Sequence, residues 1–276
     1  MKRTIGYVLY VSVAVVTLAF LLLPIVGIFV HTSPGKVLDQ LSNPVVKDAF
    51  VVTLKTSLVA QALILLFGTP TAYLLATRRF AGRSFAITLV ELPLVLPPAV
   101  AGVGLLAALG REGLLGSSLD ALGVSLPFTQ TAVTIAVAYV ASPLYIRQAI
   151  ASFEATDPHL TAASRTLGAG PVRTFFRVVL PLARGGLIAG LALSFARGLG
   201  EFGATIMFAG SLRGVTQTLP LAIYAEFDIN FDTTLAMGGV LVLISALLLL
   251  TLRIGLSWQR SPSSSSPSLF GLSSST

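Results

Sequence analysis

The chain has 276 residues, of which 54% are hydrophobic and 11% are charged, and its formal net charge is +7. A soluble domain carries about a quarter charged residues, so this composition excludes a single water-soluble core and requires the lipid bilayer as part of the solvent. Cysteine is absent, which excludes disulfides and thiolate metal sites. The positive residues flank apolar runs, which favours membrane orientation over nucleic-acid binding as the role of the charge.

Six apolar runs approach the ~20 residues that a membrane-spanning helix needs. The first is too long for the core of a signal peptide and no clear cleavage site follows it, so we expect an uncleaved span. The fifth is long and glycine-rich, and we expect it to be broken or strongly tilted. The sequence therefore predicts an all-α polytopic membrane protein with six transmembrane helices. The six runs cover residues 5–30, 54–76, 85–109, 129–152, 179–209 and 234–256.

The basic residues predict how this bundle is oriented. If six helices alternate across the membrane, one side receives Lys2, Arg3, Arg78, Arg79, Arg83, Arg165, Arg173, Arg177, Arg253 and Arg260. The loops of the other side mix basic with acidic residues. The positive-inside rule then places both termini in the cytoplasm of a cell carrying this protein in its cell membrane. We expect a transmembrane domain over residues 1–259, followed by a disordered serine-rich tail over residues 260–276.

The third run contains the stretch "ELPLVLPPAVAGVG" with three prolines, Pro93, Pro97 and Pro98. Proline donates no backbone hydrogen bond and frees the carbonyl four residues earlier, so we expect a kink. The kink has two interpretations, a packing feature or a bent helix that lines a cavity with Glu91 near its cytoplasmic end.

A basic segment at about residues 154–178 lies between the fourth and fifth runs. Asp157 and Pro158 form a good helix start, because a carboxylate caps and proline suits the first helical position. Gly168 and Gly170 can end that helix, and Pro171 can begin a second one. The pattern predicts a helix, a sharp glycine turn and a second helix near the membrane surface. Such an element either anchors the bundle in the interface or serves as a handle for a partner. Its small residues, which permit close approach of another backbone, are Ala162, Ala163 and Ser164.

The fifth run contains two charges in the stretch "LSFARGLGEFGATIMF". Arg197 and Glu201 lie four residues apart and share one face if the helix is continuous. A charge at the bilayer centre costs about 2.5–3.5 kcal/mol on insertion scales, so neither should face lipid. One interpretation is a structural ion pair, and the other is a pathway or gate for a charged solute, with Arg197 favouring an anion. The candidate pathway residues are Pro97, Pro98, Arg197, Glu201, Phe202, Gly203 and Thr205.

The basic segment resembles the cytoplasmic signature of importer-type ABC permeases: Glu-Ala-Ala, three residues, Gly, nine residues, Ile-x-Leu-Pro. Ala163, Ser164 and Gly168 fit this signature, and Leu180-Pro181 follow at the family's spacing, whereas Ala162 replaces the glutamate. The resemblance implies the type I ABC importer permease fold and a coupling helix that docks on a cytoplasmic ATPase. The coupling residues that it implies are Ala162, Ala163, Ser164, Arg165, Leu167, Gly168, Ala169, Gly170, Leu180 and Pro181.

Two further stretches, "LPLVLPP" and "FARGLGEFGAT", are similar to the molybdate/tungstate branch of that family, with sulfate/thiosulfate permeases as close relatives. This resemblance implies a homodimeric pore, a cytoplasmic ABC ATPase dimer that binds ATP and Mg, and an external molybdate/tungstate-binding protein. The binding protein would dock near residues 111–128 and 211–232. We expect no cofactor or metal in this chain.

Enzymatic activity of the chain itself is not expected. The sequence has no Gly-x-x-x-x-Gly-Lys-[Ser/Thr] phosphate loop, so ATP hydrolysis would belong to a separate chain. An intramembrane protease is excluded because His31 and His159, the two histidines, lie in loops and far apart. An ion-driven carrier remains an alternative, with Glu201 as a proton site, because buried carboxylates titrate upward.

Overall fold

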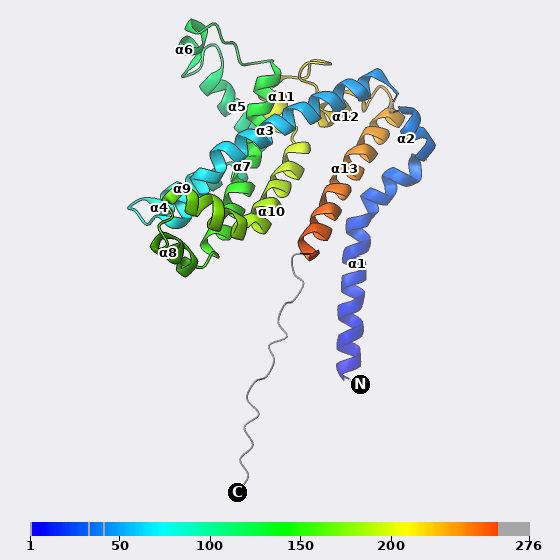
Figure 1. Ribbon diagram of the computed structural model, residues 1–276. Coiled ribbons are helices and arrows are strands. Elements are labelled where there is room, and N and C mark those ends of the chain that lie inside the picture. Colours follow the sequence, from blue (N-terminus) through cyan, green and yellow to red (C-terminus); the bar gives the residue numbers. More distant parts are fainter. Residues whose placement is uncertain (1, 33, 41, 259–276) are drawn as a thin grey trace.

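The computed structural model describes residues 2–32, 34–40 and 42–258. All secondary-structure elements in this part of the chain are helices, and it contains no strand (Figure 1). The predicted serine-rich tail lies outside the described residues. The elements are α1 Lys2–His31, α2 Pro34–Gln40, α3 Pro44–Thr77, α4 Arg83–Val95, α5 Pro98–Leu109, α6 Gly116–Ala121, α7 Gln130–Glu154, α8 Pro158–Thr166, α9 Pro171–Thr174, the π-helix η1 Phe175–Val179, α10 Leu180–Leu199, α11 Gly203–Ala209, α12 Leu219–Glu226 and α13 Phe231–Trp258.

The helices confirm an all-α membrane protein. Five stretches of the described chain are long and apolar enough to cross a bilayer, and a sixth is counted if α4 and α5 form one bent span. The five are Leu9–His31, Pro44–Thr77, Gln130–Glu154, Pro171–Leu199 and Phe231–Thr251.

The third predicted span is broken rather than kinked. Helices α4 and α5 meet at 114°. Leu96 and Pro97 between them have extended backbones, with ψ of 134° and 132°. Each of these residues precedes a proline, and a residue before proline is sterically pushed from the helical to the extended region. The Pro97–Pro98 pair therefore separates two helices where a single proline would allow a bend.

Helix α3 begins ten residues earlier than the apolar run suggested. Its cap is Asn43, whose side-chain oxygen accepts a hydrogen bond from the N–H of Val45 at 3.0 Å, and Pro44 occupies the first helical position. Lys47 and Asp48, which precede the predicted run, consequently lie within the helix. The start was missed because these two charged residues and Lys55 interrupt the apolar pattern, although the cap signal is present.

The packed centre of the bundle is α7. Of its span, 61% is buried, whereas none of the span of α1 is. Helices α3 and α10 cover α7 from two sides around Ile64, Tyr145 and Leu187. Helix α1 stands apart from this centre beside α13, where Ile28 and Phe29 lie close to Gly238 and Gly239 (Figure 1). The elements with chemical interest therefore belong to the α3–α7–α10 group and to the short helices at its two ends.

Candidate functional site

The predicted helix, glycine turn and helix between the fourth and fifth spans is present. Helix α8 begins after Asp157, whose carboxylate accepts a hydrogen bond from the N–H of His159 at 2.8 Å. Gly168 has a φ of +84°, the left-handed region that favours glycine, and α9 begins at Pro171. Local capping and turn chemistry thus fix this two-helix element, as the sequence indicated.

The two short helices are joined through their inner faces. The hydroxyls of Ser164 on α8 and Thr174 on α9 lie 3.1 Å apart in a hydrogen bond. Beside this contact is an open groove of about 560 Å³ whose lining includes Leu160, Ala163 and Leu167. The side chain of Leu167 is 88% exposed. A rigid element with an exposed apolar groove is physically suited to bind another protein.

The two-helix element continues directly into the long helix α10. Between them the backbone widens to a π-helix, in which the N–H of Leu180 bonds to the carbonyl of Phe175. Pro181 has no N–H to donate, and its ring would collide with the carbonyl four residues earlier in a regular α-helix. The widened turn accommodates that ring, and π-turns of this kind are frequent at functional sites.

A cluster of aromatic rings fixes this junction against the bundle. Phe175 lies 4.8 Å from Tyr73 of α3, and Tyr73 lies 5.4 Å from Phe153 of α7, both in edge-to-face geometry. Such pairs each contribute about 0.5–1.5 kcal/mol beyond area burial. The junction after α9 is therefore in direct contact with α3 and α7 and continuous with α10.

The opposite end of α10 carries the two charges noted in the sequence. The helix ends at Leu199 and α11 begins at Gly203, so the fifth run is broken, as the sequence predicted, and Glu201 lies in the break. The ion pair forms nevertheless, with Nη1 of Arg197 2.8 Å from Oε2 of Glu201. That oxygen accepts no aligned hydrogen bond, so the contact is chiefly Coulombic. The Glu201 residue is 2% exposed, and its other oxygen accepts a hydrogen bond from the N–H of Ala204 at 2.7 Å.

This geometry gives the two charges different tasks. Glu201 is buried and caps the start of α11, so it holds the end of α10 and the start of α11 together. The side chain of Arg197 is 32% exposed, and guanidinium has five N–H donors of which the ion pair uses few. Arg197 is therefore a cation fixed by a buried partner, with donors free to contact an anion.

Predicted pathway residues from the third and fifth spans come together at this break. A Cβ added to Gly203 would lie 2.8 Å from Cβ of Pro98, and one added to Gly102 would lie 2.6 Å from the carbonyl oxygen of Ala204. Helices α5 and α11 thus touch backbone to backbone, as small residues in membrane helices permit. Pro97, at the start of α5, is exposed.

The two remaining predicted pathway residues differ in their burial. Thr205 is fully buried, and its hydroxyl has no hydrogen-bond partner. Phe202 is half-buried, and its ring lies 5.3 Å from the ring of Tyr224, an exposed residue of α12. Thr205 therefore belongs to the interior behind the break, whereas Phe202 lies toward its surface.

A buried polar pair close to this site was missed in the sequence. Gln61 of α3 accepts a hydrogen bond from the hydroxyl of Ser194 of α10 at 2.8 Å, and the amide nitrogen of Gln61 is buried without a partner. Ser194 lies three residues before Arg197. The available signal was a single glutamine inside an apolar run, since polar side chains within the membrane are costly and usually serve a role.

The broken spans, the buried charge pair and the exposed two-helix element together define a polytopic membrane permease. Residues 64–257 match the family model described as binding-protein-dependent transport system inner membrane component. This match covers more than half of the chain, so the protein belongs to that family. It is a translocating subunit of a transport system rather than an enzyme.

Several relatives cover nearly the whole chain. The molybdenum transport system permease protein ModB of Mycobacterium tuberculosis is 37% identical over 237 residues, covering 86% of this chain and 90% of the relative. The sulfate transport system permease protein CysW of Synechocystis is 33% identical over 226 residues, covering 81% and 82%. A solved bacterial alginate ABC transporter, in complex with a periplasmic protein bound to an alginate pentasaccharide, is 16% identical with a TM-score of 0.65, covering 94% of this chain and 95% of that one. The structural likeness confirms the ABC importer permease fold.

Proposed function

We propose that this chain is the membrane subunit of an ATP-driven oxyanion importer whose substrate is molybdate or tungstate. The observation that carries the oxyanion is the geometry of Arg197, a partly exposed guanidinium held by buried Glu201 where α10 ends. A tetrahedral oxyanion offers several acceptor oxygens, and arginine donors match such groups well. The similarity to ModB supports molybdenum, and the lower identity to CysW makes sulfate the second candidate.

The proposed assembly contains two copies of this chain, an ABC ATPase dimer on the cytoplasmic side and an external binding protein. Support for the external partner comes from the alginate transporter, which was solved with its periplasmic protein. Support for the orientation comes from the basic residues of the α3–α4 turn and of the α8–α9 element, which the positive-inside rule places in the cytoplasm. Both termini of the chain then lie in the cytoplasm as well.

The α8–α9 element is the proposed docking site for the ATPase. The exposed groove at Leu160, Ala163 and Leu167 would receive the partner, and the turn at Gly168 keeps α8 and α9 at a fixed angle. ATP-driven closure of the partner would then move α10 through the junction at Pro181. In this mechanism ATP and Mg act on the partner chain, and this chain converts the movement into access to the pathway.

The substrate is tested by purifying the transporter with its binding protein and identifying the bound oxyanion by elemental mass spectrometry. We expect molybdenum or tungsten at one atom per binding protein. Sulfate in that position would replace the substrate assignment with the second candidate. Uptake into proteoliposomes that requires ATP and the ATPase partner would separate this function from the ion-driven carrier, which needs only an ion gradient.

The role of Arg197 is tested by Arg197→Gln and by Arg197→Lys. The glutamine variant should assemble with the ATPase but lose oxyanion uptake, and the lysine variant should recover part of it because the charge remains. Arg147→Gln is a matched control, because Arg147 also pairs with a carboxylate, that of Glu91, but its side chain is exposed and lies outside the proposed docking surfaces. A glutamine variant of Arg197 with wild-type uptake would refute the pathway role. Failure to assemble would assign Arg197 to structure instead.

A further inference from the structure

We propose that this permease binds an anionic phospholipid, with an acyl chain in a groove between α3 and α10 and its phosphate in an arginine-rich pocket at the end of that groove. The inference rests on the proposed function only for the side of the membrane, which would be the cytoplasmic leaflet. The site lies outside the charge pair. It is a different cavity from the groove at Leu160 and Leu167 proposed for the ATPase, although Arg165 of its polar pocket belongs to the same α8–α9 element.

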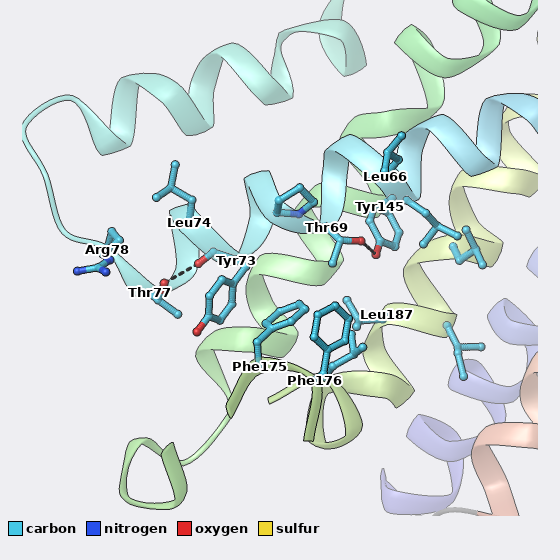
Figure 2. A pocket seen from close by; sticks show the side chains of 15 residues that line it. Leu66, Thr69, Tyr73, Leu74, Thr77, Arg78, Tyr145, Phe175, Phe176 and Leu187 are labelled. Carbon is cyan, nitrogen blue, oxygen red and sulfur yellow. Dashed lines mark hydrogen bonds between the residues drawn. The ribbon is translucent and has the colours of Figure 1, made fainter. Parts of the chain in front are cut away.

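The apolar part is a groove of about 840 Å³ between two spanning helices. Its walls are mainly apolar residues of α3 and α10, and the rings of Phe175 and Phe176 lie along it between Tyr73 and Leu187 (Figure 2). At its back the hydroxyl of Tyr145 is bound to that of Thr69 at 2.6 Å, so this polar pair is already satisfied. The side chain of Phe176 is 60% exposed. Apart from Tyr73 and Arg78 at the end near the second cavity, the groove therefore offers mainly apolar surface to the bilayer.

The dimensions fit one leaflet. The α3 wall runs from Leu65 to Arg78, and at 1.5 Å per residue this wall is about 20 Å long. Half of the hydrocarbon core of a bilayer is about 15 Å thick. An acyl chain whose end lies near Leu65 consequently brings its headgroup to the level of Arg78, where α3 ends.

The polar part is a second cavity of about 880 Å³ that begins where the groove ends. Tyr73, Thr77 and Arg78 line both cavities, so the two cavities adjoin at these residues. The second cavity is also lined by Arg79, Arg83, Arg165 and Glu154, which leaves three positive charges in excess.

Most of these arginines lack a protein partner. Arg83 bonds to the carboxylate of Glu154 and to the carbonyl of Leu75. Among the described residues, neither Arg78, Arg79 nor Arg165 forms an ion pair or a side-chain hydrogen bond. Like charges gathered without a counterion repel one another, and a phosphate diester supplies the missing negative charge with oxygens suited to guanidinium. An apolar groove leading into such a pocket has the shape and the charge of a phospholipid rather than of a free anion.

The test uses the purified transporter in a mixture of equal parts phosphatidylglycerol and phosphatidylethanolamine, with retained lipids counted by native mass spectrometry. We expect selective retention of phosphatidylglycerol, about one per permease copy. The double variant Arg78→Gln/Arg79→Gln should lower that selectivity about 25-fold, because each basic residue near the surface contributes about fivefold. The control Arg173→Gln/Arg177→Gln removes two charges from the α9–η1 segment, which lines the other groove, and should keep the selectivity.

The groove is tested separately. Ile188→Trp should fill it and lower retention of both lipids, whereas Leu193→Trp should not, although both side chains are on α10 and are 47% and 45% exposed. Only Ile188 of the two lines the groove.

Three outcomes would overturn the lipid assignment. Equal selectivity for phosphatidylglycerol in the two double variants would show that Arg78 and Arg79 do not bind the lipid phosphate. Normal retention in Ile188→Trp, with displacement of the lipid by inorganic phosphate, would show an anion pocket only. A wild-type transporter that retains no phosphatidylglycerol would show that protein covers the groove, whether a second copy or the ATPase. Binding of the ATPase by the purified permease is measured in parallel, so that the two proposals can fail independently. A permease that retains phosphatidylglycerol but does not bind the ATPase would refute the proposed function without refuting the lipid site.

Discussion

Replacing Gly203 by alanine tests whether the contact of α5 with α11 holds the break between α10 and α11 in place. The added Cβ would lie 2.8 Å from Cβ of Pro98 and 3.0 Å from the backbone nitrogen of Ala99. An ordinary carbon contact is about 3.5–4.0 Å, so the helices must separate by about 1 Å at this point. Neither obstacle is the mobile end of a side chain, and local rotamer changes cannot relieve the clash.

Overpacking of this kind costs about 1–3 kcal/mol. For a chain of this size that corresponds to a decrease in the midpoint of thermal unfolding of about 2–12 °C. The measurement is the midpoint of thermal unfolding of the purified protein in detergent, followed by circular dichroism or by thermal aggregation. Oxyanion uptake is measured in parallel in proteoliposomes.

Gly200→Ala is the matched control three residues away. A Cβ on Gly200 meets nothing within 4 Å, and its φ of −90° is open to alanine. This control should be neutral or stabilising by about 0.4–1 kcal/mol, because alanine restricts the unfolded chain more than glycine does. Equal midpoints for Gly203→Ala and Gly200→Ala would refute the reasoning, since they would show that α5 and α11 are not held at this distance.

Three further substitutions probe the other parts of the two sites. Gly168→Val places a branched side chain at a φ of +84°, at a conformational cost of about 1–2 kcal/mol, and should uncouple ATP hydrolysis from uptake. The control Gly170→Ala, at a φ of −66°, should leave coupling unchanged. Normal coupling in Gly168→Val would contradict the docking role. Glu201→Ala removes both the counterion of Arg197 and the oxygen that accepts the N–H of Ala204, whereas Glu201→Gln keeps such an oxygen. The alanine variant should therefore lower the free energy of unfolding by about 0.5–2 kcal/mol more than the glutamine variant, as measured by denaturant unfolding. Equal losses in the two variants would contradict the capping role. Ser194→Ala leaves the side-chain oxygen of Gln61 without its hydrogen bond and should lower the free energy of unfolding by about 1–3 kcal/mol in the same assay. An unchanged free energy of unfolding would show that water reaches the pair.

The two-helix element could be predicted because its signals are local. Asp157 caps within two residues, Gly168 turns the chain at its own position, and Pro171 starts a helix at its own position. Each signal acts on neighbours in the sequence, so no knowledge of the remaining bundle is needed. The same applies to Asn43 and Pro44, whose cap signal was present but was outweighed by the charged residues Lys47 and Asp48 that follow.

The break between α10 and α11 could be predicted only in part, because its contacts join distant segments. The charges and glycines of the fifth run indicated a break, but its position at residues 200–202 depends on Glu201 reaching back to Arg197 and forward to α11. The packing of Gly203 on Pro98 depends on where α5 lies after the 114° bend between α4 and α5. The prolines allow this bend but do not determine its direction. The bond between Gln61 and Ser194 joins residues 133 positions apart, and no pattern in either run indicates the other.

Helix α10 connects the two sites mechanically. With 20 residues at 1.5 Å each it is about 30 Å long, the thickness of the hydrocarbon core, so its ends lie at opposite sides of that core. One end joins α8 and α9 through the π-turn at Pro181, where the hydrogen-bond ladder is already irregular and yields more readily than a regular helix. The other end is bound to α11 by the buried carboxylate of Glu201, so any rotation of α10 that moves Arg197 must also strain the contact of α11 with α5. Under the proposed function, movement applied at the docking groove would change the position of Arg197 only by shifting the whole α10–α11–α5 group. The pathway would then open by displacement of helices as a unit rather than by rotation of single side chains.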